Sequence, residues 1–145
     1  MKKVIVSACL LGEYCRYDGK TKRVNGIVDA YKGYEIIPFC PEAPLFGTPR
    51  ERIALVATET KIKVMTEETK KDVTALLEEE ILAFCHKHTD IDAIVLKSKS
   101  PSCGNQTTPI LYANGEVMQL GDGIATQIFK KKYEKIPFYD ETDLE

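Results

Sequence analysis

The 145-residue sequence lacks several features that would place it in a common functional class. No apolar run approaches the roughly 18 residues that cross a bilayer, which excludes a transmembrane helix. Lys and Arg number 20 against 22 Asp and Glu, so the basic excess typical of nucleic-acid-binding proteins is missing. Internal repeats and low-complexity segments are absent as well. With 43% hydrophobic residues, the composition is that of an ordinary globular protein, and nucleic acids and membranes are not expected partners.

The N-terminus begins like a secretory signal but does not continue as one. Lys2 and Lys3 precede an apolar run at residues 4–6 that Ser7 interrupts, whereas secretory segments need about 7–15 apolar residues. We therefore expect a cytoplasmic protein. The sequence has five cysteines, and an odd number in a reducing compartment favours metal ligation or thiol chemistry over disulfides. The length suits a single domain, residues 1–145.

Short apolar runs alternating with helical patterns predict the fold. Buried parallel strands are expected at residues 3–7, 34–39 and 91–96. Residues 67–88 carry apolar side chains at three- and four-residue spacing, which indicates an amphipathic helix. A second helix is expected from about Gly123 to Lys132, followed by an edge segment at 136–139. Together these elements predict an α/β single-domain three-layer sandwich with a mostly parallel, Rossmann-like sheet.

Two further segments predict β structure beside this sheet. Residues 53–65 include a β-branched alternation, and residues 112–117 contain Asn114-Gly115, a pair that favours a tight hairpin turn. Ligands of open α/β sheets bind beyond the carboxyl ends of the strands. We expect both segments to border that edge.

Three cysteines, Cys9, Cys40 and Cys103, follow the three predicted strands. Because loops from neighbouring parallel strands converge at the carboxyl ends, these cysteines are expected to gather at one edge of the sheet. Two alternatives stay open: each is a buried small apolar residue, or the three form a structural zinc site with Cys15. Cys85 differs, because it shares a helical face with apolar side chains, and a buried inert thiol is expected there.

The surroundings of these cysteines favour a reactive centre. If Cys15 lies away from the site, an iron–sulfur cluster on three thiolates keeps one iron without a protein ligand, and such an iron is a Lewis acid for sulfur. Glu42 lies two residues after Cys40, where a partly dry site would suit it to proton transfer. Its alternative is a surface position in the first turn of a helix begun by Pro41.

Polar residues near the first and third cysteines suggest a substrate site. Arg16, Tyr17 and Asp18 offer a cation, a planar ring and a carboxylate that could clamp a substrate, although an ordinary Asp-Gly turn is equally compatible. Hydroxyls at Ser98, Ser100 and Ser102 crowd Cys103. Each of these serines could instead cap a turn, but we also assign Ser102 to the substrate-binding set.

A series of motifs runs in one order along nearly the whole chain. They are Ser7-Ala-Cys-Leu-Leu-Gly12, Arg16-Tyr-Asp-Gly19, Cys40-Pro-Glu42, Pro49-Arg50, Asp72-Val-Thr74, Ser100-Pro-Ser-Cys-Gly104 and Gly123-Ile-Ala-Thr126. With them the chain resembles the family known as domain of unknown function 523, whose characterised relatives are thiouracil desulfidases. The resemblance implies a [4Fe-4S] cluster with three Cys ligands, Cys9, Cys40 and Cys103, and a catalytic pair, Glu42 and Ser100. It gives no ligand role to Cys15, which could be a fourth ligand or hold released sulfur.

The function that the resemblance implies is conversion of thiouracil to uracil without net redox change. An open iron would bind the thione sulfur, Glu42 would activate water, and Ser100 would orient water or substrate. Expected partners are a small thiolated heterocycle and the cluster-assembly machinery. Two other functions stay open: a metal- or redox-sensing module without turnover, and a desulfurase of thiolated nucleotides or transfer RNA.

Overall fold

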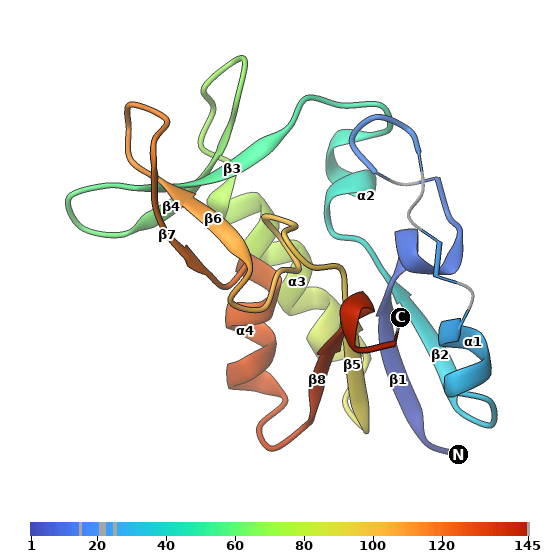
Figure 1. Ribbon diagram of the computed structural model, residues 1–145. Helices are drawn as coiled ribbons and strands as arrows, with labels where there is room; N and C mark the ends of the chain where they lie inside the picture. Colours follow the sequence, from blue (N-terminus) through green and yellow to red (C-terminus); the bar gives the residue numbers. More distant parts are fainter. Residues whose placement is uncertain (15, 21–22, 25, 145) are drawn as a thin grey trace.

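The computed structural model describes residues 1–14, 16–20, 23–24 and 26–144. Cys15, the predicted alternative metal ligand, lies outside the described residues. The described chain contains two four-stranded β-sheets with helices packed against them (Figure 1). The α/β class is confirmed, whereas the second sheet goes beyond the single sheet that the sequence predicts. None of the helices in the described part of the chain is long and apolar enough to span a bilayer.

The first sheet is entirely parallel, with strand order β2-β1-β5-β8. It comprises β1 (Lys3–Ser7), β2 (Glu35–Phe39), β5 (Ala93–Leu96) and β8 (Phe138–Asp140). The three predicted core strands and the predicted edge segment are all confirmed. Residues 4–6 are fully buried, because β1 is central and both faces of the sheet are covered.

Alternate residues of β1 point to opposite faces and so join two apolar clusters. Ile5 packs with residues of α3 (Thr74–Lys87) and α4 (Ile124–Lys132) on one face. Val4 and Val6 pack on the other face with Leu10 of the 3₁₀ helix η1 (Ala8–Leu11) and Ile27 of α1 (Gly26–Ala30). Helices therefore cover both faces of this sheet, in agreement with the predicted three layers.

The second sheet is mixed, with strand order β4-β3-β6-β7. Two antiparallel hairpins build it, one from β3 (Ile53–Ala57) and β4 (Ile62–Thr66), the other from β6 (Thr108–Leu111) and β7 (Val117–Gly121). The predicted segment 53–65 corresponds to the first hairpin, and the predicted segment 112–117 corresponds to the turn of the second. Parallel pairing of β3 with β6 joins them into one sheet. Gly115 in the second turn has a φ of 91°, a left-handed conformation that favours glycine.

Helix α3 begins later than predicted, at Thr74 and not at Glu67. The preceding residues turn back along β4, where the Thr66 amide donates to the Lys71 carbonyl oxygen and the Val73 amide to that of Val64. These backbone bonds compete with a helix over the same residues. Helix α4 agrees with its predicted bounds, and the short α2 (Glu42–Phe46) follows β2 directly.

Candidate active site

A cavity of about 700 Å³ opens where the carboxyl ends of the first sheet face the second sheet. Ser7 and Phe39, the last residues of β1 and β2, line one side of it. Ile53 and Leu55 of β3 and Leu111 of β6 line another. The second sheet therefore supplies an apolar wall opposite the strand ends, a larger contribution than the rim that the sequence predicts.

Cys9, Cys40 and Cys103 all line this cavity. Cys9 lies in η1 just after β1, and Cys40 directly follows β2. Cys103 lies in the loop after β5. The structure thus brings together the three thiols that follow the strands, although they come from distant parts of the sequence. Cys85 lies buried on α3 and is not among the lining residues, as expected.

Hydrogen bonds fix the turn that carries Cys103. Ser100 Oγ accepts from the amides of Ser102 and Cys103 at 3.0 and 3.1 Å, and the Thr126 hydroxyl donates to the Cys103 carbonyl oxygen at 2.8 Å. Ser100 therefore caps this turn, and it also lines the cavity. Both sequence-based interpretations of Ser100 are compatible with this position.

Burial raises the pKa of the Cys103 thiol to about 12, although hydrogen bonds from Ser7 and Ser100 oppose the rise. The neighbouring Cys40 and Glu42 add to it, because their negative charge disfavours a second anion. The thiol is therefore protonated at neutral pH, and a bound metal has to displace that proton.

Glu42 is the first residue of α2, and its side chain is only 11% exposed although it lines the cavity. Ser102 Oγ donates to Oε2 at 2.8 Å, and the Arg50 Nε lies 3.5 Å from Oε1. The alternative of an exposed surface glutamate is wrong. A carboxylate in this position can exchange protons with a molecule in the cavity.

Of the predicted substrate-binding residues, Arg16 and Tyr17 line the cavity, whereas Asp18 and Ser102 do not. Asp18 accepts from the Lys20 amide at 2.9 Å, and this hydrogen bond is the main reason that its pKa is lowered. Its role in the structure is that of a turn residue. Ser102 is fully buried behind Glu42.

Several cavity residues have no predicted role in the sequence-based interpretation. The Arg52 guanidinium lies 4.5 Å from the centroid of the Tyr17 ring and donates to the Tyr17 hydroxyl, and Arg50 lies against Glu42. Arg50 and Arg52 stand two positions apart just before β3, so an extended backbone places both on one side. The two-residue spacing of these arginines beside a predicted strand is the sequence signal that would have identified Arg50 and Arg52 as cavity residues.

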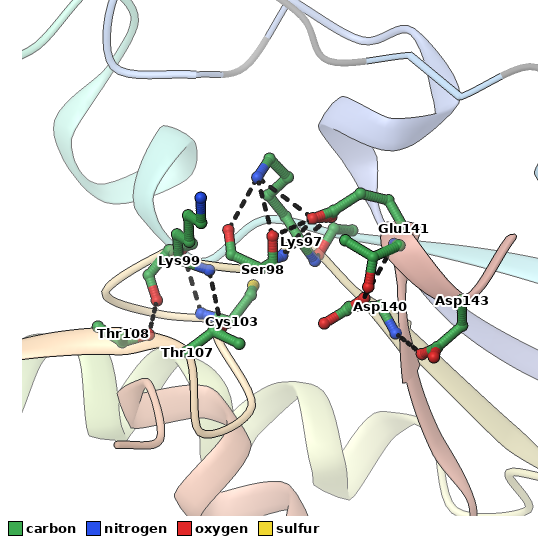
Figure 2. A network of polar contacts seen from close by, with 12 residues as sticks. Lys97, Ser98, Lys99, Cys103, Thr107, Thr108, Asp140, Glu141 and Asp143 are labelled. Atoms are coloured by element: carbon green, nitrogen blue, oxygen red, sulfur yellow. Dashed lines mark hydrogen bonds and ion pairs between the residues drawn. The ribbon is translucent and has the colours of Figure 1, made fainter. Parts of the chain in front are cut away.

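A buried network anchors the start of the Cys103 loop (Figure 2). Glu141, just after β8, accepts from the Ser98 amide at 2.9 and 3.0 Å, accepts from the Ser98 hydroxyl, and lies 3.4 Å from Lys97 Nζ. The Lys97 amide donates to Ser7 Oγ at 2.9 Å. Lys97 and Ser98 line the cavity, so Glu141 supports its wall from behind.

Within the described ranges, no three His, Cys, Asp or Glu side chains gather closely enough to hold a single metal ion. The thiols that line the cavity in the described part of the chain are Cys9, Cys40 and Cys103, which lie around a common space. Thiolates are soft ligands, which suit iron–sulfur clusters as well as zinc.

Comparison with known proteins gives consistent results. The sequence model of the 2-thiouracil desulfurase family matches residues 4–141. YbbK, an uncharacterised protein of Bacillus subtilis (strain 168), is 33% identical over 115 residues, which cover 70% of this chain and 73% of that protein. Among solved structures, the [4Fe-4S]-dependent thiouracil desulfidase TudS is 34% identical and superposes with a TM-score of 0.75. That match covers 99% of this chain and 93% of TudS. The chain therefore belongs to the 2-thiouracil desulfurase family, as the order of its motifs predicts.

Proposed function

We propose that this protein is a [4Fe-4S]-dependent desulfidase that replaces the sulfur of 2-thiouracil, or of a similar small thiocarbonyl compound, by oxygen. The observation that carries the proposal is the meeting of three cysteines and a buried carboxylate in one cavity. Membership of the 2-thiouracil desulfurase family and the likeness to TudS support it.

The residues of the cavity fit such a cluster. In a [4Fe-4S] cluster each thiolate binds a different iron, so ligands spread around a common space are compatible with it. Cys9, Cys40 and Cys103 are the proposed ligands. When bound through these three thiolates, the cluster supplies a soft Lewis acid for the substrate's sulfur.

Glu42 is the proposed proton carrier. In the overall reaction the C=S bond breaks and a C=O bond forms, with the oxygen supplied by water, so no external electron is needed. Glu42 takes one proton from the attacking water and passes it to the departing sulfur, which leaves as hydrosulfide. The second proton of the water is released to solvent as the C=O bond forms. Ser100 already accepts two amide hydrogens, so its own proton is available for the Cys103 sulfur or for a molecule in the cavity.

Arg16 and Tyr17 are the proposed substrate contacts. The Arg16 guanidinium lies 5.8 Å from the Tyr17 ring centroid, on a ring that Arg52 also approaches. Planar rings and guanidinium groups stack well on flat heterocycles. We also propose a cytoplasmic location, where the cluster-assembly machinery would load the protein.

A thiolated nucleotide is the second candidate substrate. Among the described residues, five cationic side chains line the cavity: Arg16, Arg50, Arg52, Lys97 and Lys99. A phosphate group would pair with them more strongly than a neutral base does.

The test begins with purification without oxygen, followed by measurement of iron, acid-labile sulfide and zinc. We expect iron and sulfide in nearly equal amounts, together with conversion of 2-thiouracil to uracil and sulfide. A parallel assay with a thiolated uridine monophosphate distinguishes the two substrate classes through kcat/KM. Stoichiometric zinc without acid-labile sulfide would refute the cluster, and a loaded protein that turns over neither compound would refute the desulfidase.

A further inference from the structure

Ser102 lies outside the cavity, yet it is held against the carboxylate that lines it. Its side chain is fully buried, and its hydroxyl donates to Glu42 Oε2 at 2.8 Å. The two residues are 60 positions apart in sequence, so no local turn explains the contact. A buried hydroxyl without a partner is costly, and this one uses its single proton on Glu42.

The backbone of Ser102 is fixed by the start of α4. Its carbonyl oxygen accepts from the Ala125 amide at 2.7 Å, and its own amide donates to Ser100 Oγ. Gly123 permits this close approach, because a Cβ built there would lie 2.5 Å from the Ser102 carbonyl carbon. The hydroxyl that reaches Glu42 therefore projects from one of the most constrained points of the site.

The second carboxylate oxygen faces Arg50. The Nε atom of Arg50 is fully buried and forms no hydrogen bond with the described residues, and it lies 3.5 Å from Glu42 Oε1. Nη1 of the same guanidinium donates to the Gly47 carbonyl oxygen at 3.0 Å. Arg50 thus supplies positive charge at one oxygen, while Ser102 supplies the hydrogen bond at the other.

We propose that Ser102 is a positioning residue for Glu42, whose hydroxyl fixes the direction in which the carboxylate faces the cavity. Ser102 also adjoins Cys103, so the same bond couples the proton carrier to the segment of a proposed cluster ligand. This inference rests on the proposed function, because it requires Glu42 to carry the proton. It replaces the direct substrate contact that the sequence suggests for Ser102, since the side chain does not reach the cavity.

A double-mutant cycle tests the proposal in the cluster-loaded full chain. We expect Ser102→Ala to lower kcat for 2-thiouracil between about tenfold and a hundredfold, the size of effect that a misplaced catalytic group produces. KM, iron content and sulfide content should stay unchanged. In a Glu42→Ala background the same substitution should have no further effect, because nothing remains for the hydroxyl to position.

A direct substrate contact gives a different pattern. Ser102→Ala would then raise KM and would act equally in both backgrounds. If the rate of the Glu42→Ala protein falls below detection, the dissociation constant of 2-thiouracil is measured in that background instead. An unchanged dissociation constant on adding Ser102→Ala supports the positioning role. Weaker binding of 2-thiouracil overturns it.

Thr74→Ala is the matched control. Like Ser102, Thr74 has a buried hydroxyl that takes part in a hydrogen bond. Its Oγ1 accepts from the Val64 amide at 2.8 Å, and the residue does not line the cavity. This substitution should lower the unfolding midpoint without lowering kcat. Full activity of Ser102→Ala beside an inactive Glu42→Ala would refute the positioning role and leave the desulfidase proposal standing. Inactive wild-type protein with a full cluster would instead refute the proposed function itself.

Discussion

At Glu42, a charged group is buried at the wall of a cavity and held at both oxygens. Burying an ionised carboxylate costs free energy unless a cation and hydrogen bonds compensate for it. Arg50 and Ser102 supply both, and each comes from a different segment of the chain. The position is therefore built for a carboxylate, which a surface role would not require.

Replacement of this carboxylate tests its role in proton transfer. Glu42→Gln keeps the size of the side chain and its ability to accept from Ser102, but it removes the proton carrier. We expect the cluster to remain and kcat for 2-thiouracil to fall by about 10²–10⁴-fold, the usual contribution of general acid–base catalysis. Iron content measures cluster retention, and single-turnover rates measure the chemical step. Undiminished turnover at full cluster occupancy would remove Glu42 from the mechanism.

Among the elements, helix α3 has a start that depends on one acidic side chain. Asp72 Oδ1 accepts from the Thr74 amide at 3.0 Å, and hydrogen bonds from Thr74, the hydroxyl first, lower the Asp72 pKa. Lys63 adds an ion pair at 3.5 Å, but both partners are partly exposed, so its contribution is small. Asp72 thus satisfies one of the amides that every helix start leaves without an intrahelical partner.

Removing this carboxylate should destabilise the fold in a pH-dependent way. Asp72→Ala should lower the free energy of unfolding by about 0.5–1 kcal/mol at neutral pH, the loss expected for one partly exposed hydrogen bond at a helix start. Because the folded-state pKa is depressed, the stabilisation is complete above the unfolded-state pKa of about 3.9 and is lost as the pH falls through the folded-state value. Urea unfolding at neutral and acidic pH measures the loss of stability and its dependence on pH. Asp90→Ala, at an exposed position, is the control. An equal loss at both pH values would contradict the assignment.

The elements also show where local sequence patterns suffice. The strands around β1 are predictable because continuous apolar runs indicate burial on both faces, and α4 because its apolar spacing begins just after Gly123. The pairing of β3 with β6 joins two hairpins far apart in sequence, and neither hairpin carries a signal for the other. The apolar helical spacing begins only at Val73, so it does not extend to the polar residues 67–72. In the structure, this segment turns back along β4, with backbone hydrogen bonds from Thr66 to Lys71 and from Val73 to Val64.

On the scale of the whole molecule, the site combines predictable and unpredictable parts. The positions of Cys9, Cys40 and Cys103 follow from strand ends and parallel topology. The contact of Ser102 with Glu42 and that of Glu141 with Ser98 depend instead on how distant segments pack. Spacing within a single sequence contains no information about such contacts, and for this reason Ser102 was predicted as a substrate ligand.

Because the three proposed ligands lie on three separate segments, each should be indispensable. Single replacement of Cys9, Cys40 or Cys103 by Ala should abolish cluster retention, measured as iron and acid-labile sulfide after anaerobic reconstitution. Cys85→Ala is the control, because Cys85 is buried next to Tyr133 and does not line the cavity. Burial also raises the pKa of its thiol. Full iron and sulfide in any of the three variants would exclude that cysteine as a required ligand.

The hydrogen bonds and the ion pair that Glu141 forms with Ser98 and Lys97 have a consequence for biosynthesis. A ribosome makes Cys9, Cys40 and Cys103 before it makes Glu141, so the loop carrying Cys103 emerges without the carboxylate that anchors it. Strand β8 must first dock on β5 to bring Glu141 into place. A nascent chain therefore exposes its thiols in an unfinished pocket, and we expect iron and sulfide to be delivered only after this late strand has been synthesised and has folded.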